Sequence, residues 1–271
     1  MDSCYGYQIR RRLGFGGRGI VFSGLRKSDN LRVAIKIIKG KGLKRTTSDG
    51  VPTKVFLLKR AQTVPGIIKV VEHFRRSGND ILVMEQFGTS DLFDWIFLNG
   101  PSDDHIARHI FKQVVKIIEE CFNQGIVHGD IKDENILINH TTLEIKVIDF
   151  GEGMIVDGRP FRKFHGTLVH SPPEWFNSWE FAQEPWTVWT LGVLLFTLIF
   201  EEYPFKKLDV AQTNPYSNPL WNTLKRKDKN LQTLVHQCLA LNLREHIPLP
   251  QILQHPWMQH NKSQTDRTDE S

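Results

Sequence analysis

The chain has 271 residues, which is enough for one large domain or a two-lobed one with a sizeable core. Hydrophobic residues make up 40% of the chain and no low-complexity block dominates, so a low-complexity protein is excluded. The formal net charge is +5, but Lys and Arg are scattered, and no basic stripe indicates a nucleic-acid partner.

Cysteines and apolar runs limit the choice of compartment. Three cysteines without a Cys-x-x-Cys pair support neither a zinc site nor a disulfide framework, and Cys121 and Cys238 are predicted to be core thiols. Residues 1–4 contain no apolar signal region, and the longest apolar run, residues 188–200, is shorter than the roughly 20 residues that cross a bilayer. We expect no membrane partner and a cytoplasmic protein, with the nucleus as a further location.

The first part of the chain, residues 5–85, is strand-rich. A glycine run at 14–17 interrupts two β-prone segments. A strand, a polar loop, a short helix and another strand are then predicted over residues 32–38, 39–50, 51–62 and 80–84.

Beyond about residue 90 the apolar period becomes helical. Residues 102–104 provide capping and dipole-favoured side chains for a helix that continues to Cys121. Further helices are expected over residues 188–200 and 231–241, and residues 259–271 are expected to be a flexible tail. The pattern predicts an α+β protein, with a small β-rich lobe followed by a larger helical lobe.

A tight loop at residues 128–135 carries the most informative chemistry. It contains a carboxylate, an amine and an amide, Asp130, Lys132 and Asn135, and a second carboxylate, Asp149, follows one β-hairpin later. Such a set can hold magnesium, a phosphate chain and an attacking hydroxyl together, as phosphoryl transfer requires. Taken singly, each Asp or Asn could instead cap a turn.

Two earlier features fit the same chemistry. Glycines at 14, 16 and 19 would let a β-turn lie close over phosphate oxygens, although an ordinary hairpin turn is the alternative. Lys36 lies inside an apolar strand, where a buried ammonium needs a partner.

These motifs, in this order, resemble those of the eukaryotic protein kinases. The five motifs are Gly14-x-Gly16-x-x-Gly19-x-Val21, Val33-Ala34-Ile35-Lys36, His128-Gly129-Asp130 with Asn135, Asp149-Phe150-Gly151 and Pro172-Pro173-Glu174. The resemblance covers residues 7–258, with an N-lobe at about 7–85 and a C-lobe at about 89–258. Within the family the chain is most similar to the Pim serine/threonine kinases, and less so to the PAS-domain kinases. The stretches that carry this similarity are 91–94, 130–138, 166–175, 238–241 and 255–259.

The resemblance implies a two-lobed kinase fold that transfers the γ-phosphoryl group of ATP, with Mg²⁺, to protein Ser or Thr hydroxyls. Asp130 would be the catalytic base, Lys132 would neutralise the transferring phosphoryl group, and Thr167 would hydrogen-bond Asp130. Asn135 and Asp149 would bind Mg²⁺. The further nucleotide contacts implied are Leu13, Gly14, Gly16, Gly19, Val21, Ala34, Lys36, Met84, Glu85, Phe87 and Leu137.

The chain departs from the family pattern at Lys54. By alignment, this position should carry a helix glutamate that pairs with Lys36. We therefore expect Lys36 to pair with Asp149 or with nucleotide, or the helix to rotate. The departure leaves an alternative open, in which the protein is a nucleotide-binding pseudokinase that acts as a scaffold.

Two other departures concern regulation and stability. Gly129 stands where most kinases have an arginine that receives an activation-segment phosphate, and residues 149–166 contain no Ser, Thr or Tyr. Activity without activation-segment phosphorylation is therefore expected. His246 replaces an arginine that would bind Glu174, which predicts a less stable helical lobe.

Acidic side chains suggest the substrate class. Asp91, Asp94, Asp133, Glu134 and Glu202 would favour protein substrates with basic residues before the target Ser or Thr. They could instead be solvated surface acids, and Lys206 and Lys207 would weaken the preference. A monomer is expected.

Overall fold

The computed structural model describes residues 6–16, 19–39, 47–48, 50–88, 90–158, 170–178, 182–205 and 218–259. Thr167, Lys206, Lys207 and the predicted tail beyond residue 259 lie outside these ranges. The chain divides into two compact units, of which the first comprises Met1–Trp95 and Glu120–Asp157, and the second Ile96–Glu119 and Gly158–Ser271.

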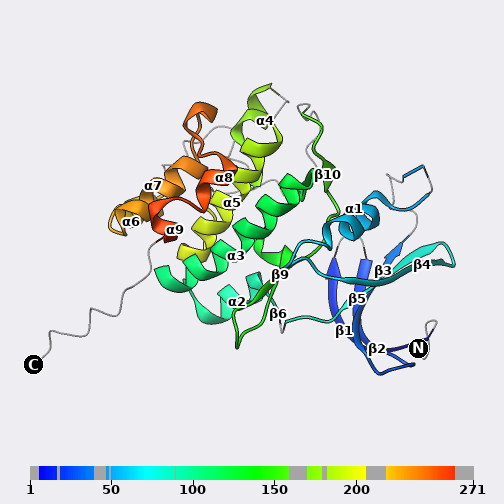
Figure 1. Ribbon diagram of the computed structural model, residues 1–271. Coiled ribbons are helices and arrows are strands. Elements are labelled where there is room, and N and C mark those ends of the chain that lie inside the picture. Colours follow the sequence, from blue (N-terminus) through cyan, green and yellow to red (C-terminus); the bar gives the residue numbers. More distant parts are fainter. Residues whose placement is uncertain are drawn as a thin grey trace, which may run out of the picture. The chain divides into compact units, whose positions relative to one another are not determined.

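The first unit is built on a five-stranded antiparallel sheet, seen in blue and cyan in Figure 1. The strand order is β1-β2-β3-β5-β4, so β2 pairs with both β1 and β3, while β3 pairs with β5 and β4 lies at the edge. The predicted strand-rich region is thus confirmed. The strands span Tyr7–Gly16 (β1), Gly19–Arg26 (β2), Arg32–Lys39 (β3), Val70–Arg76 (β4) and Asn79–Glu85 (β5).

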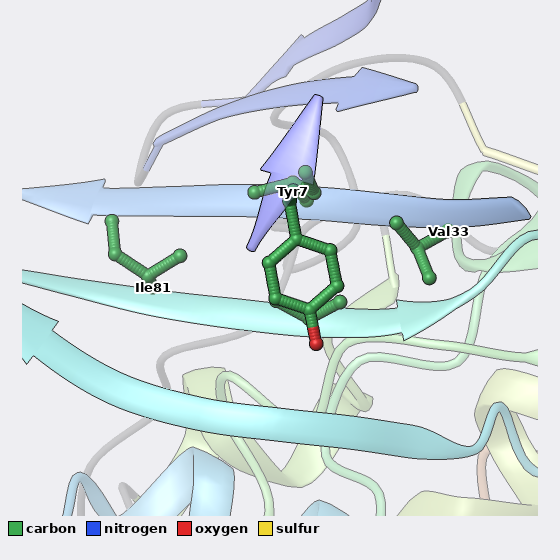
Figure 2. Packing of buried hydrophobic residues seen from close by; sticks show 5 residues of the cluster. Tyr7, Val33 and Ile81 are labelled. Atoms are coloured by element: carbon green, nitrogen blue, oxygen red, sulfur yellow. The ribbon is translucent and has the colours of Figure 1, made fainter. Parts of the chain in front are cut away.

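Alternation along β3 separates the two faces of this sheet. Val33 and Ile35 are fully buried and pack with Tyr7 and two residues of β5, Ile81 and Val83. Figure 2 shows the Tyr7 ring with Ile81 and Val33 to either side of it. Successive side chains of a strand point to opposite faces, so Ala34 and Lys36 lie on the other face of β3.

Helix α1 (Thr53–Ala61) follows the β3 strand and buries four side chains, those of Val55, Leu57, Leu58 and Ala61. It begins two residues later than predicted because Pro52 occupies the N-cap position. The loop after α1 is bonded to β9 (Ile145–Val147): the Val147 N–H donates to the Gly66 carbonyl at 2.8 Å. The helix is therefore anchored close to the residues that follow β9.

The remaining strands of the first unit carry the loop at 128–135. β7 (Ile126–Val127) pairs with β10 (Met154–Ile155), and β8 (Ile136–Ile138) pairs with both β6 (Ser90–Asp91) and β9. A 3-10 turn, η2 (Asp133–Asn135), leads into β8. The hairpin β8–β9 therefore lies between the loop and Asp149, as predicted.

The second unit is helical. Among the described residues its helices are α2 (Leu92–Asn99), α3 (Asp104–Asn123), α4 (Pro173–Ser178), α5 (Gln183–Phe200), α6 (Leu220–Leu224), α7 (Lys229–Cys238), α8 (Leu249–Ile252) and α9 (Pro256–Gln259) (Figure 1). The first half of α2 and the last turn of α3 are assigned to the first unit. The Asp103 carboxylate caps α3 by accepting two backbone N–H groups, as the sequence predicted.

The core of the second unit surrounds α5. Almost every residue of α5 is buried, and its Trp189 ring stacks on Phe205 with centroids 5.2 Å apart. Helix α5 begins five residues before the predicted apolar run. The apolar pattern missed its first turn, which begins with polar residues and contains Pro185, a residue that is tolerated at the start of a helix. Within the described ranges, no helix is long and apolar enough to cross a membrane. Cys121 and Cys238 are buried thiols, as predicted.

Candidate active site

A network of hydrogen bonds fixes the loop that carries Asp130. The Asn135 Nδ2 group donates to the Asp130 carbonyl at 2.7 Å and to its Oδ2 at 3.0 Å. The Asp130 N–H donates to His128 Nδ1 at 3.2 Å, and His128 Nε2 donates to the Ile148 carbonyl at 2.9 Å. This arrangement requires a neutral imidazole, and burial of His128 accordingly lowers its pKa. The Asp130 carboxylate is thus held in one orientation by Asn135.

His128 also packs against the residue that follows Asp149. The centroids of the His128 and Phe150 rings lie 4.6 Å apart at an interplanar angle of 58°, and both residues are almost completely buried. The ring contact and the His128–Ile148 hydrogen bond join the Asp130 loop to the Asp149 segment. This link keeps two carboxylates, 19 residues apart in sequence, in one substructure.

The backbone conformation and surroundings of position 129 require a glycine, which the sequence alone did not reveal. Its φ is +80°, a conformation that L side chains rarely adopt, and a Cβ atom there would lie 2.2 Å from the Glu152 carbonyl oxygen. The resemblance to protein kinases predicted only that Gly129 replaces an arginine that receives a phosphate. In this chain the glycine also permits the close approach of two backbone segments.

Lys132 lies between two carboxylates. Its Nζ is 2.5 Å from Glu134 Oε2 and 3.8 Å from Asp130 Oδ2. Burial opposes the charged form, but the hydrogen bond to Glu134 and the nearby negative charges outweigh burial and raise the Lys132 pKa. Lys132 therefore carries a positive charge beside Asp130, where it can neutralise charge on a transferred group.

Lys36 of β3 pairs with Asp149, one of the two partners that the sequence analysis had expected. Both side chains are mostly covered, with 15% of the Lys36 side chain and 30% of the Asp149 side chain exposed. Asp149 adopts a left-handed φ of 61°, and its Oδ1 accepts the Gly151 N–H at 3.1 Å. Burial opposes ionisation of Asp149, but the Lys36 charge and hydrogen bond, together with the charge of Lys54, lower its pKa to about 2.

The donor atoms in this region fit a magnesium ion. Asn135 uses its amide nitrogen for both bonds to Asp130, so the amide oxygen is the atom it can offer to a cation. Asp149 is an ionised carboxylate in the same unit. Carboxylate and amide oxygens are the hard ligands that Mg²⁺ prefers. Asn135 and Asp149 are therefore suited to the role that the resemblance implies.

One face of the five-stranded sheet presents several of the implied nucleotide contacts. Lys36 lies directly opposite Val21 of β2 and Leu82 of β5, and Val21 in turn lies opposite Gly14 of β1. Directly opposed residues point to the same face, so these side chains lie on the face away from the Tyr7 core. Ala34 and Met84, also an opposed pair, share this face.

Three further positions implied by the resemblance have distinct surroundings. A Cβ atom on Gly19 would lie 2.3 Å from the Ile37 carbonyl oxygen. The close pairing of β2 with β3 is therefore sufficient to require glycine at this position, whether or not a nucleotide binds. Leu13 is 42% exposed in β1, and Leu137 lies in β8 opposite Lys146. Gly16, which ends β1, is described by its backbone only.

Lys146 of β9 organises the linker after β5 and is not among the residues predicted from the sequence. It forms an ion pair with Glu85, and its ammonium lies 5.1 Å from the centroid of the Phe87 ring. The Glu85 carboxylate also accepts the Lys69 N–H at 2.9 Å. The side chains of Glu85 and Phe87 are thus engaged with protein groups, and the Glu85 N–H donates to the Lys69 carbonyl at 3.0 Å. The signal in the sequence was the apolar–polar–apolar alternation of Ile145, Lys146 and Val147, which places Lys146 on the opposite face from its two buried neighbours.

Four of the five predicted acidic residues lie in the first unit and interact. Burial raises the pKa of Asp91, and the charges of Asp94 and Glu134 raise it further. Burial also raises the pKa of Asp133 to about 6, with Glu134 adding to the effect. Burial is the largest cause of both shifts, repulsion between the carboxylates adds to it, and Glu134 is also paired with Lys132. The fifth residue, Glu202, is exposed and belongs to the second unit.

Comparisons with known proteins agree with this chemistry. The family described as "Protein kinase domain" matches residues 7–258. Serine/threonine-protein kinase pim-2 of Danio rerio is 38% identical over 267 residues, which cover 93% of this chain and 84% of that protein. Serine/threonine-protein kinase prk-2 of Caenorhabditis elegans is 31% identical, over 93% of this chain and 58% of that protein. The PAS domain-containing serine/threonine-protein kinase of Mus musculus is 30% identical, over 94% of this chain but 18% of that protein.

Proposed function

Because the chain belongs to the protein kinase family and is a Pim-like serine/threonine protein kinase, we propose that Asp130 accepts the proton of the substrate hydroxyl during phosphoryl transfer. The observation that carries this assignment is the double hydrogen bond from Asn135, which orients the Asp130 carboxylate. Such positioning is most of what a protein contributes to phosphoryl transfer.

The other charged residues have complementary roles. Protein kinases use ATP and Mg²⁺, and the bound metal neutralises phosphate charge and orients the γ-phosphoryl group. In this chain, Asn135 and Asp149 would hold the metal, while Lys36 would hold the α- and β-phosphates. Lys132 would neutralise the transferred group beside Asp130, a role supported by its 3.8 Å separation from that carboxylate.

Labelled ATP tests the assignment and the alternative together. Purified protein is incubated with γ-labelled ATP, Mg²⁺ and a Ser-containing basic peptide, beside an Asp130→Asn variant. Transfer by the native chain and a loss of about 10²- to 10⁴-fold in the variant would support the proposed role. Nucleotide binding without transfer by either protein would instead favour a pseudokinase scaffold, the alternative suggested by Lys54 at the position of the helix glutamate. Equal transfer by both proteins would eliminate Asp130 as the base.

The protein acts on protein substrates, and we propose that it prefers basic residues before the target Ser or Thr. The interacting acids Asp91, Asp94 and Glu134 support this preference, because cationic side chains would relieve their mutual repulsion, whereas Asp133 is buried and acts on them only through its charge. A peptide array that varies the positions before the phosphorylated residue tests it. A flat response to Lys and Arg would count against the proposal.

Activity without activation-segment phosphorylation is also proposed. Gly129 offers no charged group to a phosphate, and residues 149–166 offer no hydroxyl to a kinase. Treatment with a phosphatase should therefore leave the transfer rate unchanged. We further propose a monomer with a cytoplasmic and nuclear distribution, to be checked by light scattering and by imaging of a tagged chain.

A further inference from the structure

Lys146 of β9 connects the β8–β9 hairpin to the linker after β5, residues 86–88, within the first unit. Its ammonium forms the ion pair with Glu85 and lies 5.1 Å from the centroid of the Phe87 ring. Only 18% of the Lys146 side chain and 27% of the Glu85 side chain are exposed. Because the pair is mostly shielded from water, removal of the ammonium would leave a poorly solvated carboxylate. The ion pair therefore constrains where the linker can lie.

The far end of the linker rests on the same hairpin. Gly88 has φ = +70°, and a Cβ atom on it would lie 2.7 Å from the Ile138 carbonyl oxygen of β8. Just beyond the linker, Ser90 of β6 pairs with Ile138. Phe87 thus lies between an anchor on β9, which is the Lys146 side chain, and an anchor on β8, which is the backbone of Ile138.

The backbone of Phe87 is available to a ligand. Among the described residues, none is hydrogen-bonded to the Phe87 N–H or carbonyl. The Glu85 N–H, by contrast, donates to the Lys69 carbonyl. Leu137 of β8, another implied nucleotide contact, lies directly opposite Lys146, so both side chains lie on one face of the hairpin. The linker is therefore held by a lysine on the face that also carries Leu137.

We propose that Lys146 is a positioning residue for the nucleotide base, because it holds Glu85 and Phe87 so that the linker backbone is preset for the edge of adenine. The proposal rests on the proposed function, since it concerns the nucleotide of the same site. Lys146 acts through the linker, because its ammonium is engaged by the Glu85 carboxylate and the Phe87 ring. A preset linker reduces the ordering cost of binding the base. The base does not react, so this binding sets the KM for ATP rather than kcat.

Calorimetric titration of the full chain with adenosine and with ADP tests the proposal, because adenosine carries the base without phosphates. Lys146→Met removes the charge, and Lys146→Arg keeps a cation for the carboxylate and the ring. We expect the Kd of both ligands to rise by the same factor in Lys146→Met. That factor is about tenfold, between the effects of an exposed and of a buried ion pair. Lys146→Arg should recover most of the native affinity. Lys59 is exposed on α1, so Lys59→Met removes a charge away from the linker and should leave both Kd values unchanged.

Transfer kinetics separate positioning of the base from a general loss of structure. With γ-labelled ATP and the basic peptide, Lys146→Met should raise the KM for ATP about tenfold and leave kcat at the native value. A purely structural role would lower the folded fraction, and hence the apparent kcat, without changing KM.

Four results would overturn the proposal. They are a native adenosine Kd in Lys146→Met, a rise for ADP without a rise for adenosine, an affinity in Lys146→Arg as low as in Lys146→Met, and a loss of kcat at constant KM. If circular dichroism shows that Lys146→Met does not fold, Glu85→Gln decides. It removes the ion pair and keeps an oxygen for the Lys69 N–H, and a native adenosine Kd in that variant rejects the role of Lys146.

The proposed function fails in a different way. Binding of adenosine by the native chain without phosphoryl transfer would remove the catalytic assignment of Asp130, and a weakened Kd in Lys146→Met would still support the role of Lys146. A native chain that binds neither adenosine nor ADP would remove both proposals.

Discussion

Substituting Gly129 by alanine should destabilise the first unit far more than an ordinary glycine substitution. The residue would have to adopt φ = +80°, which costs an L residue about 1–2 kcal/mol. Its Cβ atom would also lie 2.2 Å from the Glu152 carbonyl oxygen and 2.7 Å from the carbonyl carbon, both backbone atoms that no side-chain rotation can move. Relief of such a contact by a backbone shift costs about 1–3 kcal/mol.

The reduced entropy of the unfolded alanine chain offsets about 0.4–1 kcal/mol of this cost. We therefore expect Gly129→Ala to lower the free energy of unfolding by about 2–4 kcal/mol. Gly78→Ala is the matched control, because Gly78 in the β4–β5 turn has φ = +75° but no atom within 4 Å of its added Cβ. The control should cost only about 0.5–1 kcal/mol, since it pays for the dihedral angle alone.

Urea unfolding followed by circular dichroism measures both variants, with the slope m checked for constancy. Hydrogen exchange over residues 126–153 should show faster opening in Gly129→Ala and no change in Gly78→Ala. Equal destabilisation by the two substitutions would refute the argument, because it would mean that the contact with Glu152 adds nothing. The same clash means that Gly129→Arg should not create a phosphate-dependent switch.

The remaining predictions concern thiols, pH and substrate charge. Burial raises the pKa of Cys121 and Cys238 to about 12, so both should resist a thiol reagent at pH 8 until guanidinium unfolds the chain; fast reaction in native buffer would contradict this. Burial lowers the His246 pKa below its unfolded value near 6.5, so its stabilising contribution is complete above that pH and is lost as pH falls through the folded pKa. The native protein should therefore be more stable than the His246→Gln variant at pH 7.5, and this difference in unfolding free energy should be smaller at pH 5. A difference that stays constant between these pH values would contradict the prediction. Replacing Asp91 and Asp94 together by Asn, which preserves the helix cap, should raise KM for a basic peptide about 2- to 10-fold and leave a neutral peptide unchanged.

Local spacing was sufficient to identify the chemistry of the Asp130 loop. Asp130 and Asn135 are five residues apart and Asp149 follows one hairpin, so the backbone alone keeps them near one another. The apolar periodicity likewise predicted β3, β5 and the long helices α3, α5 and α7, but not β4 or the shorter helices α2, α4, α6, α8 and α9. Boundaries such as the start of α5 were less exact, because polar first-turn residues do not appear in an apolar pattern.

Residues far apart in sequence acquired their meaning only from the tertiary structure. Lys36 and Asp149 are 113 residues apart, and their pairing depends on how the sheet and the β8–β9 hairpin pack together. The approach of Glu152 to Gly129 and the influence of the Lys54 charge on the pKa of Asp149 depend on the same packing. The sequence determined which charged groups are available, because their order and spacing are local properties. Only the folded chain decided which charges face one another, because distances across a packed core are set by every element between them.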